Sequence, residues 1–114
     1  MTRKLIALLT IVTLTGCFGT KLVTPSQTDA DRAQAKYPGI SVADLKSGKS
    51  LYEANCDKCH PLKKPASRTE SEWMKIVPNM VMKVNKKTGT EMSAEDEEKI
   101  LHYLITMSEA PAKK

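Results

Sequence analysis

The sequence SVADLKSGKSLYEANCDKCH, residues 41–60, contains the chemically most informative part of this 114-residue chain. It ends in Cys56 and Cys59, two cysteines three positions apart, and His60 follows the second directly. Such a group occurs in redox-active dithiols, in zinc sites and in sequences that attach a larger cofactor covalently. The residues on either side of the group distinguish these three alternatives.

The residues before Cys56 have the pattern of a helix. Ser41 is a suitable N-cap, with Asp44 in the acidic position three residues later. The apolar positions that follow fit one helix face: Val42, Leu45, Leu51 and Tyr52. Gly48 lies inside this helix, where a glycine costs roughly 1 kcal/mol relative to alanine, and it indicates that another backbone comes close.

This helical pattern argues against the first two alternatives. A thioredoxin-like dithiol follows a strand, and a zinc site needs four ligands. The one histidine outside the group, His102, is expected to be a plain residue on the solvent side of the last helix. The remaining interpretation is a c-type haem attachment sequence, in which both thiols bond to the haem and the imidazole reaches the iron. We therefore expect one covalent haem c, held by Cys56, Cys59 and His60.

A second helix is predicted after the cysteine group. Thr69 and Glu72 form a capping box, and apolar residues then recur at helical spacing: Trp73, Ile76, Val77, Met80 and Val84. Pro78 falls inside this run, so we expect a kink or a break after Val77. Residues 85–91 have the composition of a turn.

A third helix follows that turn. Ser93 is its N-cap, acidic residues at positions 95–98 complement the positive end of the helix dipole, and the apolar pattern continues to about Met107. No segment has the pattern of a strand. The sequence thus predicts an all-α fold, with three main helices around one covalently bound haem.

At this point the chain resembles a small monohaem bacterial cytochrome c. In that family a glycine eight residues before the first haem cysteine, and an aromatic residue four before it, pack against the C-terminal helix. Gly48 and Tyr52 stand at those offsets, and Ile100 and Tyr103 match the residues of the C-terminal helix that receive them. The resemblance implies a cytochrome c-like domain over residues 41–108. The chain departs from the family in its short connection before the last helix, which lacks a Met-Pro loop.

The second axial ligand of the iron is expected to be a methionine, since His/Met ligation is common in cytochromes c. The candidates are Met74, Met80, Met82 and Met92. Met80 shares a helix face with Trp73, and this spacing resembles small cytochrome subunits of periplasmic dehydrogenases, which implies Met80 as the ligand. Met82 is expected to face water unless the proline turns it inward, and Met92 to pack against the first turn of the last helix. Arg68 and Trp73 are candidate contacts of the haem propionates or edge.

The N-terminus has the features of an export signal. Two basic residues precede a ten-residue apolar run, which is half of the roughly 20 residues that a spanning helix needs. The run ends at Leu-Thr-Gly-Cys17, which resembles a bacterial lipoprotein signal. This resemblance implies that residues 1–16 are removed, that Cys17 is lipidated, and that the protein is on the periplasmic side, at the outer membrane in a Gram-negative cell. Residues 17–40 read as a flexible tether and residues 109–114 as a tail.

The charge distribution indicates the class of partner. Without residues 1–16 the formal charge falls from +5 to +3, which argues against nucleic acid. Residues 57–87 carry eight bases and three acids, which favours docking to an acidic redox protein such as a dehydrogenase or an oxidase. We therefore expect a non-enzymatic electron carrier. The alternatives are a dedicated haem subunit of a periplasmic dehydrogenase, and a haem sensor or peroxidase with an open sixth position.

Overall fold

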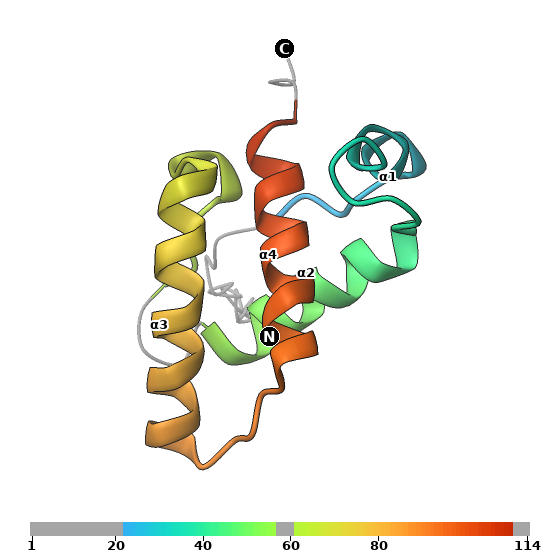
Figure 1. The fold of residues 1–114 in the computed structure, drawn as a ribbon. Coiled ribbons are helices and arrows are strands. Elements are labelled where there is room, and N and C mark those ends of the chain that lie inside the picture. Colours follow the sequence, from blue (N-terminus) through green and yellow to red (C-terminus); the bar gives the residue numbers. More distant parts are fainter. Residues whose placement is uncertain (1–21, 57–60, 111–114) are drawn as a thin grey trace, which may run out of the picture.

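The computed structural model describes residues 22–56 and 61–110, and within these ranges the chain is helical and has no strand (Figure 1). The prediction of an all-α fold is therefore confirmed for the described part of the chain. The elements are α1 (Gln27–Ala33), α2 (Val42–Cys56), the 3₁₀ turn η1 (Pro65–Ser67), α3 (Glu70–Thr88) and α4 (Ala94–Ser108).

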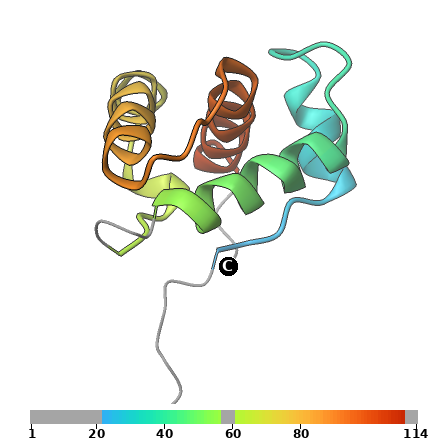
Figure 2. The same ribbon diagram turned by 90° about the horizontal axis from the view of Figure 1, so that it is seen from below.

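The helices form two layers. α3 and α4 lie side by side, and α2 crosses beneath both of them (Figure 2). α1 flanks α4 on the side away from α3 (Figure 1). None of the helices in the described ranges is both long enough and apolar enough to cross a membrane.

Reciprocal capping boxes begin the three long helices at the predicted residues. In α2 the Asp44 backbone N–H donates to the Ser41 hydroxyl at 3.1 Å, and the Ser41 N–H donates to the Asp44 carboxylate at 2.9 Å. The same pattern starts α3 at Thr69 and α4 at Ser93. The backbone hydrogen bond from Ser41 lowers the pKa of Asp44, since it favours the charged carboxylate. The helix starts follow from local chemistry.

The crossing of α2 and α4 depends on Gly48. A Cβ atom at this position would lie 2.1 Å from the Lys99 carbonyl oxygen and 2.9 Å from the Tyr103 Cβ. The glycine is therefore the point at which the two backbones touch, as the sequence predicts. This contact sets the angle of the helix that carries Cys56 against the helix that closes the core.

One apolar cluster fills the space between the three long helices. Its largest fully buried members are Trp73, Tyr52, Tyr103, Ile100, Leu104 and Val77. Tyr52 packs edge-on against Trp73, with ring centroids 6.2 Å apart and planes at 82°. Edge-to-face packing of this kind adds about 0.5–1.5 kcal/mol to the burial of the rings.

Of the kink or break expected after Val77, the break does not occur: α3 is continuous from Glu70 to Thr88. Pro78 lies on the exposed side of the helix. The backbone donor that proline lacks would have bonded the carbonyl of Met74, and on this side water can bond that carbonyl instead. Val77 and Val81 meanwhile continue the buried face past the proline.

The expected turn at residues 85–91 is shorter than predicted, since its first part belongs to α3. The helix ends at Gly89, which has φ 68° and donates its N–H to the Asn85 carbonyl at 3.0 Å. This left-handed residue is a common helix C-cap. The Asn85 side chain then accepts the Met92 backbone N–H at 3.0 Å and thereby fixes the approach to α4.

The N-terminal segment differs from the flexible tether expected for residues 17–40, because its described part, from residue 22, packs on the domain. Leu22 is 8% exposed and belongs to the core cluster. Further along, Ala30, Ala33 and Ile40 form a second buried cluster with Leu45 of α2. The small alanine side chains let α1 approach α2 closely. Because no large apolar residue of α1 is involved, the sequence pattern does not reveal this contact.

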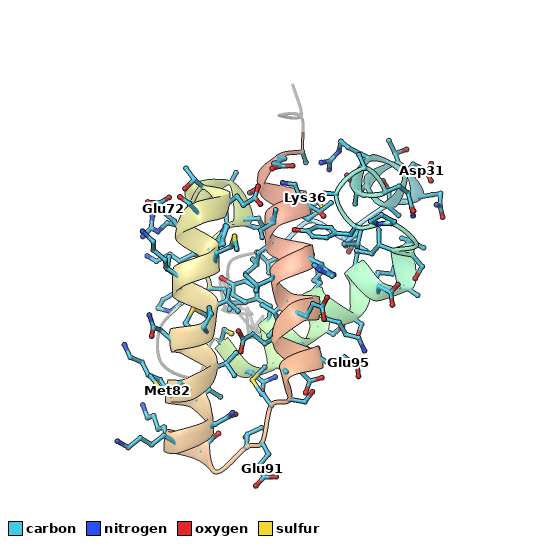
Figure 3. The ribbon with its side chains drawn as sticks, in the orientation of Figure 1. Asp31, Lys36, Glu72, Met82, Glu91 and Glu95 are labelled. Atoms are coloured by element: carbon cyan, nitrogen blue, oxygen red, sulfur yellow. The ribbon has the colours of Figure 1, made fainter. Side chains whose placement is uncertain are left out.

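Polar contacts hold the same segment against α4. Arg32 donates to the Thr106 carbonyl at 3.0 Å. Lys36, which is labelled in Figure 3, pairs with Glu70 and Glu109. The Glu109 and Glu70 carboxylates raise the pKa of Lys36, and the Lys36 ammonium lowers the pKa of Glu109. The segment that follows α1 is thus joined to both α3 and α4.

His102 is not the plain solvent-side residue expected from its position on α4. Its side chain is 23% exposed and its ring lies 3.9 Å, centroid to centroid, from the ring of Tyr37. Burial lowers the pKa of His102 from 6.5, although Glu98 and Asp44 oppose this shift. The reason for the difference is the N-terminal segment, which covers this face of the helix.

We predict that the folded protein loses stability as the pH falls through about 6.5, because the unfolded chain then protonates His102 more readily than the folded chain does. The loss levels off below the depressed pKa of the folded state. Urea unfolding of the wild type and of His102→Gln at about pH 5 and pH 7 measures it. The wild type should lose more stability than the variant, and equal losses would show that this histidine is not responsible.

Candidate cofactor-attachment site

Cys56, the first cysteine of the predicted haem attachment sequence, is the last residue of α2. It is 3% exposed and belongs to the core cluster. Cys59 and His60, the other two attachment residues, and Cys17, the expected lipidation site, lie outside the described residues. The structure therefore places one of the three attachment residues, at the position where α2 meets the apolar interior.

Tyr52 joins the two sides of the cysteine group. It lies one helical turn before Cys56, and its hydroxyl donates to the Lys63 carbonyl at 2.8 Å and accepts the Lys63 N–H at 3.1 Å. Burial of the ring is the main cause that raises the pKa of Tyr52 to about 12. The hydroxyl is thus a neutral donor and acceptor that fixes the chain after the group to the helix before it.

Trp73 fixes the same segment from α3. Its indole N–H donates to the Pro65 carbonyl at 2.9 Å, and the side chain is 1% exposed. Trp73 was a candidate haem-edge contact, and the structure shows that its one polar hydrogen bonds to the backbone. Arg68, the candidate propionate contact, is partly exposed and donates to the Ser67 carbonyl at 3.0 Å.

The sequence predicts Tyr52 as a packing residue against the last helix, and the structure bears this out, with ring centroids of Tyr52 and Tyr103 6.4 Å apart. The sequence does not predict the hydrogen bonds of Tyr52 to Lys63. These bonds depend on the path of the backbone after the cysteine group, and no local pattern encodes that path.

We predict that Tyr52→Phe lowers the free energy of unfolding by about 1 kcal/mol, since it removes two hydrogen bonds while the ring stays in place. Chemical denaturation measures this. Tyr103→Phe is the matched control, because the Tyr103 hydroxyl lies 3.5 Å from the Val23 carbonyl, at the limit of a hydrogen bond. An equal loss in both variants would contradict the assigned role.

The face of α3 that opposes Cys56 is apolar. Its buried residues are Trp73, Val77, Val81 and Val84, and they share one cluster with Cys56. Met80 is partly buried and packs against the same cluster. The residues of this face recur at helical spacing, as the sequence predicts.

The other three candidate methionines differ in the exposed fraction of their side chains. Met74 and Met82 are 57% and 61% exposed, and neither belongs to the cluster. Met92 is 9% exposed and is a member of the cluster. Of the four candidates, Met80 and Met92 are therefore the two that contact the cluster containing Cys56, to which Met107 of α4 also belongs.

The described residues around Cys56 have the apolar chemistry that a covalently attached haem would require. The macrocycle is flat and largely apolar, and the cluster presents a buried thiol, an apolar helix face and a thioether sulfur. Every member of this cluster is an apolar, aromatic or sulfur-containing side chain. Within residues 22–56 and 61–110, no three or more histidine, cysteine or acidic side chains are grouped to hold a metal ion.

No protein-family model, no curated protein and no solved structure matches the chain.

Proposed function

We propose that this protein is a membrane-tethered, monohaem c-type cytochrome that carries single electrons. Cys56 and Cys59 hold the haem, His60 is one axial ligand and Met80 is the other. The observation that carries this proposal is the burial of Cys56 at the end of α2, in one apolar cluster with the face of α3 that presents Met80. The backbone contact at Gly48, where the cytochrome family places it, supports the same fold.

The chain's own residues suit an electron carrier. When bound, a haem with two axial ligands supplies a one-electron Fe(III)/Fe(II) couple. Trp73 and Val77 exclude water from the site, and each is 1% exposed or less. Tyr52 and Trp73 hold the chain around the attachment sequence through Lys63 and Pro65. These bonds would hold the chain around the attachment sequence in place when the oxidation state changes.

On this proposal, the tether between the lipid and the folded domain is short. Cys17 carries the lipid, and Leu22, five residues later, is already packed in the core. Five extended residues span at most roughly 18 Å. The cytochrome domain is therefore held close to the bilayer, on the periplasmic side, where its redox partners are other proteins of that compartment.

Carbon monoxide tests whether the iron is closed to external ligands. We expect the visible spectrum of the reduced protein to be unchanged by CO, because the methionine occupies the sixth position. Rapid CO binding to the wild type would contradict the carrier function and favour a sensor or peroxidase. Purification in a stoichiometric complex with a dehydrogenase would instead favour the dedicated subunit.

We predict that Met80→Ala opens the sixth position and converts the reduced protein to rapid CO binding. Met92→Ala and Met82→Ala are the matched controls, one buried and one 61% exposed. Both controls should keep the wild-type spectrum. CO binding by Met92→Ala but not by Met80→Ala would instead identify Met92, in the segment before α4, as the sixth ligand.

A further inference from the structure

A hollow of about 300 Å³ lies between α3 and α4, and much of its lining is apolar. Leu101 and Ile105 line it from α4, and Met74 lines it from α3. On α4 the lining extends from Ala94 to Ile105, which is roughly 16 Å of helix. The two helices lie side by side (Figure 1), so the hollow is a groove that follows them.

The groove faces away from α2. Lys99 of α4 meets Gly48 of α2, and Leu101 lies two positions later, about 200° further around α4. In Figure 2, α2 accordingly crosses α4 on the other side. Among the described residues, none from α2 lines the groove. A molecule bound there would contact a different face of the fold from the helix that carries Cys56.

The positive charge in the groove is already neutralised. Lys36 is the one lysine or arginine among the described residues that line it. Its ammonium group pairs with Glu70, which also lines the groove, and with Glu109 at 2.9 Å. Lys36 is therefore not free to neutralise further carboxylates.

Two carboxylates on the α4 side of the groove have no cationic partner at neutral pH. Glu97 lines the groove and forms no ion pair within residues 22–56 and 61–110. Glu98 lies 3.5 Å from the His102 Nε2, but burial lowers the pKa of His102 from 6.5, so this ring is uncharged at pH 7. The groove thus combines an apolar floor with an uncompensated negative rim.

We propose that this groove binds a basic amphipathic helix of a partner protein. The apolar side of that helix would lie on Leu101 and Met74, and its lysines or arginines would pair with Glu97 and Glu98. A groove between two helices accepts a third helix through apolar anchors one turn apart, and the unbranched Met74 adapts to them. The inference goes beyond the proposed function, whose expected partner is acidic and is attracted by the bases of residues 57–87.

Other occupants fit the groove less well. A small organic cation would pair with a carboxylate but cover only part of a floor that is roughly 16 Å long. An extended peptide gains its affinity from the free edge of a sheet, and a groove lined by two helices offers none. An anionic bilayer is repelled by the same carboxylates that attract a basic helix.

The test is a titration of the reduced, isotope-labelled holoprotein with a synthetic amphipathic helix that has lysines on one side and leucines on the other. A peptide with glutamate in place of lysine is the control probe. We expect the lysine peptide to shift the amide signals of residues 70–74 and 94–105, and to bind more weakly as salt rises. Shifts confined to other residues, or equal binding of the glutamate peptide, would overturn the proposal.

Substitutions on the two sides of the groove locate the site. Glu97→Lys should weaken binding of the lysine peptide by about tenfold, and Met74→Ser should weaken it severalfold. The matched controls are Glu91→Lys and Met82→Ser, since both residues are exposed and neither lines the groove. Equal weakening by the controls would overturn the proposal. So would a dimer of the protein alone that Glu97→Lys dissociates, because a second copy would then occupy the groove. The visible haem spectrum should be the same in all four variants, so a failure here is distinct from a failure of the proposed function.

Discussion

Replacing Gly48 with alanine should lower the free energy of unfolding by about 3 kcal/mol or more, the upper part of the range for overpacking. The added Cβ would lie 2.1 Å from the Lys99 carbonyl oxygen and 2.8 Å from its carbon. These are backbone atoms of α4, so no side-chain rotation relieves the contact and the two helices must separate. The higher helix propensity of alanine offsets only about 1 kcal/mol of this loss.

Urea unfolding followed by circular dichroism measures this loss. Ser50→Ala is the control, since Ser50 is exposed on the same helix and its replacement should change stability by less than about 0.5 kcal/mol. A Gly48→Ala variant as stable as Ser50→Ala would show that α2 and α4 do not cross at this residue. It would also remove the strongest structural support for a cytochrome-like arrangement.

The double variant Cys56→Ala/Cys59→Ala should lose the haem and most of its helical signal. The domain is small, and the whole chain has one tryptophan and one phenylalanine. A core of this size is close to the lower limit for independent folding. On the proposed function, an attached haem would add apolar surface to the cluster around Trp73, and its thioether bonds would restrict the unfolded chain.

Far-UV circular dichroism of the mature variant measures the effect. The control is Met82→Ala, a substitution at a residue 61% exposed, which should keep native helicity. Near-native helicity in the cysteine variant would show that the polypeptide folds without help from a cofactor. The loss expected from alanine at the buried Cys56 alone is much smaller than a complete unfolding, because the two side chains differ by one sulfur atom.

The three long helices could be predicted from the sequence because their starts depend on local chemistry. Ser41, Thr69 and Ser93 each have an acidic residue three positions later, and all three pairs form reciprocal hydrogen bonds. Gly48 was informative for a related reason. A costly residue inside a helix requires an explanation, and the close approach of Lys99 provides one.

The N-terminal segment could not be predicted in the same way. Its contacts come from small side chains and from distant polar groups, such as the bond from Arg32 to the Thr106 carbonyl. Neither leaves a periodic apolar pattern. The same segment covers His102 through Tyr37. The wrong expectation that His102 faces solvent therefore follows from the wrong expectation that this segment is a flexible tether.

Around the candidate site, the sequence predicts the buried face of α3 but not the hydrogen bonds that hold the chain on either side of the cysteine group. The position of Met80 beside the apolar face of α3 follows from helical spacing, and the structure places it there. The bonds from Tyr52 to Lys63 and from Trp73 to Pro65 join segments that are 11 and 8 residues apart through backbone atoms. A backbone acceptor has no sequence signature, so such bonds appear only in the folded chain.

The most direct test of the proposed cytochrome is the intact mass of the protein purified from membranes, together with a pyridine haemochrome assay. The account predicts a red protein whose mass equals residues 17–114 plus the lipid plus one haem, with the haem retained after denaturation. A colourless protein whose mass is that of the polypeptide and lipid alone would contradict the assignment of Cys56, Cys59 and His60.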